Sequence, residues 1–139
     1  MLGVDLFSKK HSKPQNRIDT LIGAGTVIDG NVNFTGGMRI DGQINGDVIA
    51  VAGKLSTLVL SEQGVVNGDV SVSHLVVNGG ICGTVTASEY MELHAKARVT
   101  GDVHYKTLEI QVGAVLEGRL NHINSADIEN VVSFKTSNN

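Results

Sequence analysis

Near its middle the chain reads Gly64-Val65-Val66-Asn67-Gly68-Asp69-Val70, in which each glycine is followed two positions later by a valine. Variants of this heptapeptide recur along most of the sequence. Three have the same length, at residues 42–48, 79–85 and 97–103, and two contain one extra residue, at 25–32 and 113–120. A unit that recurs at a nearly fixed period is the signature of a solenoid.

The aliphatic residues of the repeats fall into three rows. The second valine of each unit gives a row with successive gaps of 16, 22, 15, 18 and 17 residues, namely Val32, Val48, Val70, Val85, Val103 and Leu120. A second row precedes it: Val27, Ile44, Val66, Ile81, Val99 and Val115. The third consists of alternating pairs: Met38/Ile40, Leu58/Leu60, Leu75/Val77, Met91/Leu93 and Leu108/Ile110.

Such alternation indicates strands with one buried face. Three short strands per repeat, separated by glycines that permit tight corners, predict one triangular coil of a β-helix. We therefore expect an all-β chain with a single β-helix of about six coils over residues 21–120 and flexible tails at 1–20 and 121–139. The long gap between Val48 and Val70 predicts an insertion around Ala52-Gly53-Lys54.

Composition excludes several classes of protein. The chain has 17 glycines and no tryptophan, so valine, isoleucine and leucine must build the core. A net charge of −3 does not mark a nucleic-acid binder. The lone cysteine, Cys82, favours a reducing compartment, and we expect neither a membrane-spanning run nor a secretory signal. No Walker loop or dinucleotide fingerprint occurs, so we expect no cofactor and no nucleotide.

The N-terminal segment, residues 1–20, differs from the repeats because it combines apolar and basic side chains. The residues expected to contact a membrane surface are Leu2, Val4, Leu6, Phe7, Lys9 and Lys10. The alternative is a disordered tail with incidental apolar residues. At the other end, residues 121–139 form either a cap over the last coil or a free tail, and Phe134 lies within this segment.

Three motifs carry the resemblance of this chain to a known family. They are Thr20–Gly30 followed by Arg39-Ile40-Asp41-Gly42, Leu75–Gly79, and Ala97–Val103 with the last two coils through Gly118. Together they resemble the bactofilins, bacterial cytoskeletal proteins, over about residues 20–120.

The resemblance implies a right-handed β-helix that polymerises end to end without nucleotide, with contacts that alternate head to head and tail to tail. It also implies that Leu6–Lys10 is a membrane-targeting segment. The expected partners are then other copies of the chain, inner-membrane lipids and cell-wall or morphogenetic proteins that the sequence does not identify. The expected location is the cytoplasmic face of the inner membrane.

The ends of a β-helix expose unpaired backbone groups and an apolar cross-section, so polymerisation is also expected on physical grounds. Phe34 and Phe134 are the candidate interface residues. Either one can instead be ordinary packing: Phe34 in the core, and Phe134 in a cap.

The rival function is that of a hexapeptide-repeat acyltransferase or another trimeric enzyme. Ile22, Ile28, Phe34 and Ile40 follow a six-residue period, which then lapses. The spacing of His74, His94 and His104 favours surface positions over a convergent zinc site.

The aspartates that follow glycine, Asp47, Asp69 and Asp102, suggest either a calcium ladder or corner chemistry. We expect corners, because no paired-glycine calcium motif is present. No metal, catalytic or cofactor residue is therefore assigned.

Overall fold

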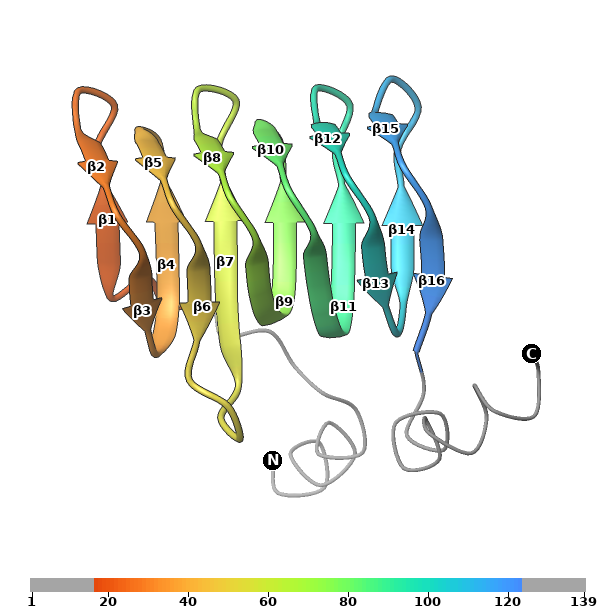
Figure 1. Ribbon diagram of the computed structural model, residues 1–139, viewed down its shortest axis with the longest axis horizontal. Coiled ribbons are helices and arrows are strands. Elements are labelled where there is room, and N and C mark those ends of the chain that lie inside the picture. The colour runs from red at the N-terminus through yellow and green to blue at the C-terminus, as the bar shows by residue number, and fades with distance from the viewer. Residues whose placement is uncertain (1–16, 124–139) are drawn as a thin grey trace, which may run out of the picture.

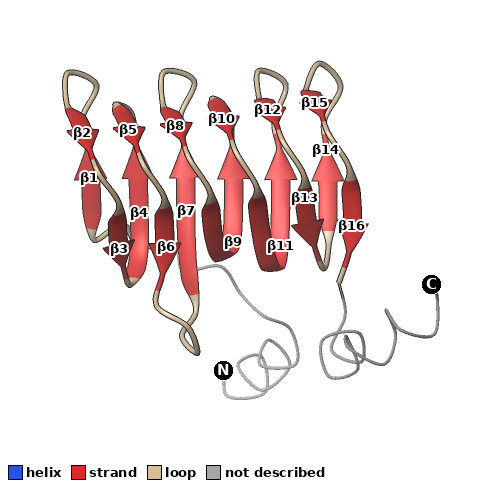
Figure 2. Cartoon of the chain, in the orientation of Figure 1, coloured by secondary structure: helices blue, strands red, loops and turns tan. Residues whose placement is uncertain are grey.

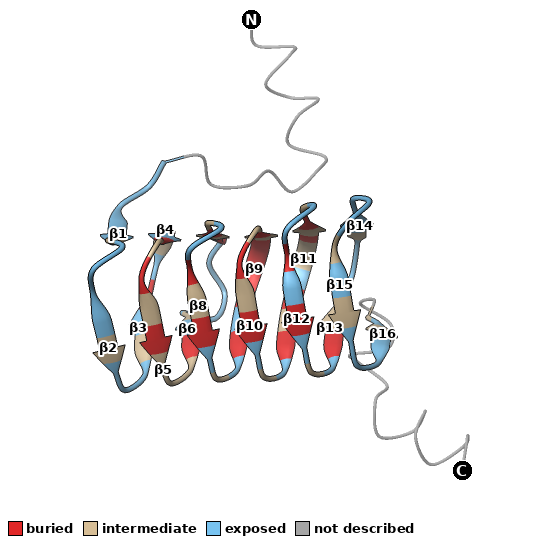
Figure 3. Cartoon of the chain, turned by 90° about the horizontal axis from the view of Figure 1, so that it is seen from above, coloured by how far each residue is buried: buried red, intermediate tan, exposed pale blue. Residues whose placement is uncertain are grey.

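A computed structural model describes residues 17–123. These residues form sixteen β-strands and no helix, hence none long enough to cross a membrane (Figure 2). The strands wind into a β-helix whose three faces each stack six parallel strands (Figure 1). In Figures 1 and 3 the chain rises on the far side, descends on the near side and advances coil by coil, which makes the helix right-handed. The predicted fold class is confirmed.

The bounds of the strands follow the three faces. The first face contains β1 (Thr20–Ile22), β4 (Gly36–Ile40), β7 (Ser56–Leu60), the second halves of β9 (Val70–Val77) and β11 (Val85–Leu93), and β14 (Leu108–Ile110). The second contains β2 (Val27–Asp29), β5 (Gln43–Asn45), β8 (Val65–Asn67), β10 (Gly80–Cys82), β12 (Arg98–Thr100) and β15 (Val115–Glu117). The third contains β3 (Val32–Phe34), β6 (Val48–Ala50), the first halves of β9 and β11, β13 (Val103–Tyr105) and β16 (Leu120–His122).

Strand register confirms two of the three predicted rows. The row from Val32 to Leu120 pairs residue for residue on the third face. The alternating pairs from Met38/Ile40 to Leu108/Ile110 stack on the first face.

On the second face the prediction is wrong at both ends. Ile28 pairs with Ile44 and Leu116 pairs with Val99, whereas Val27 and Val115 point outward and are 58% and 41% exposed. At both positions two aliphatic residues follow one another in the sequence, so the sequence does not show which of the two points inward.

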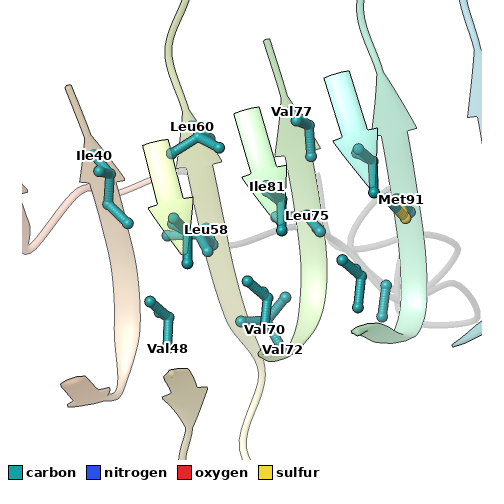
Figure 4. Close-up of a cluster of buried hydrophobic side chains, with 14 of the residues drawn as sticks. Ile40, Val48, Leu58, Leu60, Val70, Val72, Leu75, Val77, Ile81 and Met91 are labelled. Carbon is teal, nitrogen blue, oxygen red and sulfur yellow. The ribbon is translucent and has the colours of Figure 1, made fainter. Parts of the chain in front are cut away.

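The core is a column of aliphatic side chains between the faces (Figure 4). In the interior coils these side chains are almost completely buried, as at Ile44, Leu60 and Val85. Ser56 and Ser73 are also buried and satisfy each other: the Ser56 amide donates to Ser73 Oγ over 2.7 Å, and Ser73 Oγ donates to the Ser56 carbonyl over 2.7 Å. These two polar groups inside the coil are thus paired, as burial requires.

The predicted insertion is present between β6 and β7. Residues 51–55 form an exposed loop, and Gly53 turns with φ of 83°. This loop accounts for the longest interval between adjacent repeats.

Candidate functional site: the two ends of the β-helix

Strand pairing stops at the first and last coils. β1, β2 and β3 each pair on one side only, and so do β14, β15 and β16, within residues 17–123. In Figure 1 the two sets lie at opposite ends of the rod. An unpaired edge presents backbone N–H and C=O groups to any strand that can add to it. Each end therefore offers three such edges, one per face.

The core is exposed at the C-terminal end. Ile110 and Leu120 are 48% and 46% exposed, although their counterparts one coil earlier, Leu93 and Val103, are fully buried. Figure 3 shows the same change from buried interior coils to exposed outer coils. Since Ile110 and Leu120 occupy the same rows as their buried counterparts but have no coil beyond them, a further coil would cover them.

The N-terminal end is apolar as well. Ile22, Ile28 and Val32 are half-buried, whereas their partners in the second coil are fully buried. Leu21, which is 59% exposed, adds apolar surface on the first face.

The chain reaches this end through Asp19, whose carboxylate accepts a hydrogen bond from the Gly37 amide over 3.0 Å. That hydrogen bond lowers the pKa of Asp19. Asp19 thus extends the pairing of β1 with β4 by one residue.

Aromatic side chains stand near both ends of one inward row on the third face. Phe34 is 8% exposed and packs in the core, opposite Ala50. Near the other end the rings of Tyr105 and His122 meet edge to face, with centroids 5.6 Å apart. The structure shows Phe34 as a core residue, and its interface role stays a prediction. Tyr105 and His122 were missed, although each lies two positions after a residue of the predicted row.

Polar side chains line the second face. Asn67 Nδ2 donates to Asn45 Oδ1 over 3.0 Å, and Asn45 Nδ2 donates to Asp29 Oδ1 over 2.7 Å. Asp29 ends this row at the N-terminal coil, and Glu117 occupies the same row in the last coil. Both ends of the rod therefore present a carboxylate on this face.

The repeated aspartates have a structural role at the corners. Asp47 Oδ1 accepts from the Asp69 amide, Asp69 Oδ1 from the Thr84 amide, and Asp102 Oδ1 from the Arg119 amide, over 2.9 to 3.1 Å. Each carboxylate thus holds the next coil, as the corner interpretation predicts. Within residues 17–123, no three potential metal ligands come together.

The histidines lie on different parts of the rod. His74 is buried beside Ser73, where a surface position was expected, because it lies at the bend of β9 with Thr57 and Tyr90 paired on either side of it. His94 and His104 are half-buried on the first and third sides of the coil. His74 and His94 lie at opposite ends of the first face and His104 lies on the third, so the three imidazoles do not come together.

A polar cluster on the first face includes His94. His94 Nε2 lies 3.1 Å from Glu92 Oε1, and the Tyr90 hydroxyl lies 2.6 Å from Glu109 Oε1 and 2.9 Å from Glu92 Oε2. The hydrogen bond from His94 lowers the pKa of Glu92, and the hydrogen bond to the Glu109 carboxylate raises the pKa of Tyr90. The Tyr90–Glu109 hydrogen bond joins the last two coils.

A surface groove of about 480 Å³ lies beside this cluster. It is bounded by the corner around Glu62 and Gln63 and by His94, with Arg39 and Asp41 at its far side. In this groove hydrogen bonds from Arg39 and then Ser61 lower the pKa of Asp41, whereas His94 contacts Glu92.

The remaining predicted site residues fall outside residues 17–123. They are the membrane-contacting candidates Leu2, Val4, Leu6, Phe7, Lys9 and Lys10, and the interface candidate Phe134. Their roles stay predictions.

Comparison with known proteins shows similarity along the β-helix. Residues 20–121 match the family model described as Bactofilin, polymer-forming cytoskeletal. The chain is 27% identical over 122 residues to bactofilin BacP of Myxococcus xanthus, covering 88% of this chain and 48% of BacP, so it spans about half the length of that relative. It is 28% identical over 102 residues to BacO of the same organism, covering 73% of this chain and 78% of BacO.

One solved structure is also similar. It is the cryo-EM reconstruction of Thermus thermophilus bactofilin double helical filaments, with a TM-score of 0.67 and 29% identity. The match covers 73% of this chain and 96% of the filament subunit.

Proposed function

Because this chain belongs to the bactofilin family of polymer-forming cytoskeletal proteins, we propose that it assembles end to end into nucleotide-independent filaments through its first and last coils. The observation that carries this proposal is the exposure of core residues at the rod ends, led by Ile110 and Leu120. Stacking a second subunit buries these side chains and pairs the free strand edges in one step. The similar Thermus bactofilin forms filaments.

The same surfaces favour alternating polarity. Continuing the parallel register from β15 onto β2 of the next subunit would set Glu117 opposite Asp29, in the row that both residues occupy. Like charges directly opposite on neighbouring strands are destabilising. Contacts between like ends do not require this pairing, so we infer head-to-head and tail-to-tail joints.

Electron microscopy of the nucleotide-free protein tests assembly. Leu120→Glu places a charge on the C-terminal end surface and should leave at most dimers joined through their N-terminal ends. Ser71→Glu, an exposed position on the flank of β9, is the matched control and should form normal filaments. Unchanged filaments from Leu120→Glu would refute the end contact. Discrete trimers that bind acyl-coenzyme A would instead support the rival enzyme.

The filament is proposed to attach to the inner membrane through the N-terminal segment. Each of Leu2, Val4, Leu6 and Phe7 adds on the order of 1–2 kcal/mol when partly buried among lipid head groups, and each nearby lysine about 1 kcal/mol at an anionic surface. One copy therefore binds weakly and reversibly. A filament that displays many copies gains avidity without any new contact.

Deletion of residues 1–13 tests the anchor. The truncated protein should still form filaments but should no longer co-sediment with anionic liposomes. Undiminished sedimentation with lipid would rule out this segment as the anchor.

The filament's work is proposed to be that of a scaffold without catalytic activity, which positions cell-wall or morphogenetic proteins at the cytoplasmic face of the membrane. The uncovered flanks of the rod are available to such partners, and the family is cytoskeletal. Crosslinking in cells followed by identification of the attached proteins tests this role. Recovery of the chain alone would refute the scaffold role.

A further inference from the structure

The insertion loop, residues 51–55, departs from the regular coil. It lies on the edge where the third face turns into the first. There β9 and β11 continue through the corner as single strands, whereas this loop separates β6 from β7. In Figure 1 it projects below every other corner of that edge.

The loop and the strand before it, β6, carry exposed apolar side chains. Ile49, Val51 and Leu55 are 38%, 45% and 51% exposed and form what we call the loop patch. The other large apolar residues exposed within residues 17–123 all belong to the first or last coil: Ile18, Leu21, Val27, Ile110, Val112, Val115 and Leu120. End-to-end assembly places a further coil against the ends where those seven lie, although Val27 and Val115 point outward from the second face. It leaves the loop patch, in the interior of the rod, in water.

The charge of the loop differs from that of the rod. Residues 17–123 contain seven Lys and Arg and eleven Asp and Glu, a net charge of −4. Residues 49–57 contain one charged residue, Lys54. Lys54 forms no ion pair with any of residues 17–123. The corner aspartates, such as Asp69, lie on a different edge, between the second and third faces. An anionic surface would therefore attract the loop and repel the edge that carries the corner aspartates.

The loop also lies close to the place where the N-terminal segment joins the rod. The Asp19 amide donates to the Gly37 carbonyl over 2.8 Å, and Gly37 pairs with Thr57 at the start of β7. The first strand of the β-helix, β1, is therefore two strands away from β7, which follows the loop. This separation corresponds to about 10 Å along the axis of the rod. The described part of the chain therefore begins on the same edge as the loop.

We propose that the insertion loop is a second membrane contact of the filament. Val51 and Leu55 enter the head-group region of an anionic bilayer while Lys54 pairs with lipid phosphate. This inference rests on the proposed membrane attachment, and it adds a contact within the β-helix itself. Together the anchor and the loop fix which edge of the filament faces the lipid.

The natural absence of tryptophan supplies a specific probe. In Val51→Trp of the full chain, added vesicles of mixed phosphatidylcholine and phosphatidylglycerol should shift the indole emission to shorter wavelength, and brominated lipid should quench it. Gln63→Trp, in the exposed corner between β7 and β8 on the opposite edge, is the control and should show neither change. If the emission of Val51→Trp does not respond to vesicles with which the variant sediments, the proposal is overturned.

A second pair of variants measures the contribution to binding. Val51→Ser with Leu55→Ser should lower vesicle partitioning of the full chain about tenfold, because two apolar side chains no longer enter the lipid. Filament length and thermal midpoint should stay unchanged, since both side chains lie outside the core. Unchanged partitioning would refute the contact.

Two other results distinguish the alternatives. An emission shift of the Val51→Trp variant that appears on assembly without lipid would assign the patch to lateral pairing of copies and overturn the lipid contact. Failure of the unmodified chain to bind vesicles would instead refute the proposed anchor, and the loop contact with it.

Discussion

The close stacking of corner glycines makes a strong prediction at Gly68. A Cβ added there would lie well inside 3.0 Å of the Gly46 carbonyl oxygen and 2.9 Å from Asp47 Oδ1. The obstructing carbonyl is backbone in the preceding coil, so two coils must separate for the methyl group to fit. We expect Gly68→Ala to cost about 3 kcal/mol, at the upper end for overpacking.

For a domain of this size that cost lowers the thermal midpoint by about 10 °C. Circular dichroism at matched protein concentration measures it, because assembly itself makes the midpoint depend on concentration. Gly25→Ala is the control: no atom lies within 4 Å of the added Cβ, so the midpoint should hardly move.

Gly30→Ala separates backbone strain from crowding. Gly30 has φ of 138° but nothing near the added Cβ, so its cost of roughly 1–2 kcal/mol is conformational alone. Equal midpoints for Gly68→Ala and Gly25→Ala would refute close packing as the reason for the glycine stack.

Two further predictions concern side chains on the rod surface. Asp69→Ala removes the acceptor of the Thr84 amide and should cost about 1 kcal/mol, with Glu62→Ala as an exposed control. Calcium should leave the midpoint of the unmodified protein unchanged, and a rise of several degrees would reinstate the calcium ladder. Because the folded pKa of Glu92 lies below its ordinary value of 4.5, its stabilisation is complete above that pH and is lost as the pH falls. The free energy of unfolding of Glu92→Gln should therefore fall less steeply with decreasing pH below 4.5 than that of the unmodified chain, as measured in denaturant titrations. An equally steep fall in both proteins would contradict this prediction.

The second row shows why register was only partly predictable. Val27-Ile28 and Val115-Leu116 each offer two aliphatic candidates, and counting forward from the preceding glycine selects the wrong one. Counting back from the following glycine places Ile28 two before Gly30 and Leu116 two before Gly118, as Val66 stands two before Gly68. The stacked glycine keeps the register, since it is the point of closest approach between coils.

The candidate site was harder to predict than the fold. That the rod ends matter follows from the unpaired edges of any β-helix. The identity of the side chains at those ends does not follow from the sequence, because an aliphatic residue fits the repeat equally well in an interior coil and in a terminal coil. Phe34 was singled out as an aromatic and is core, whereas Ile110 and Leu120 look like ordinary members of their rows.

What the sequence determined by itself is the coil: its three strands, its six-fold repetition, its insertion and its aliphatic core. These features depend on neighbours a fixed distance apart in the chain, so periodicity is sufficient to predict them. The tertiary structure decided which surfaces remain uncovered. Exposure of Ile110, Leu120 and the loop patch depends on whether another coil lies beyond or beside each residue, and that is a property of the whole stack.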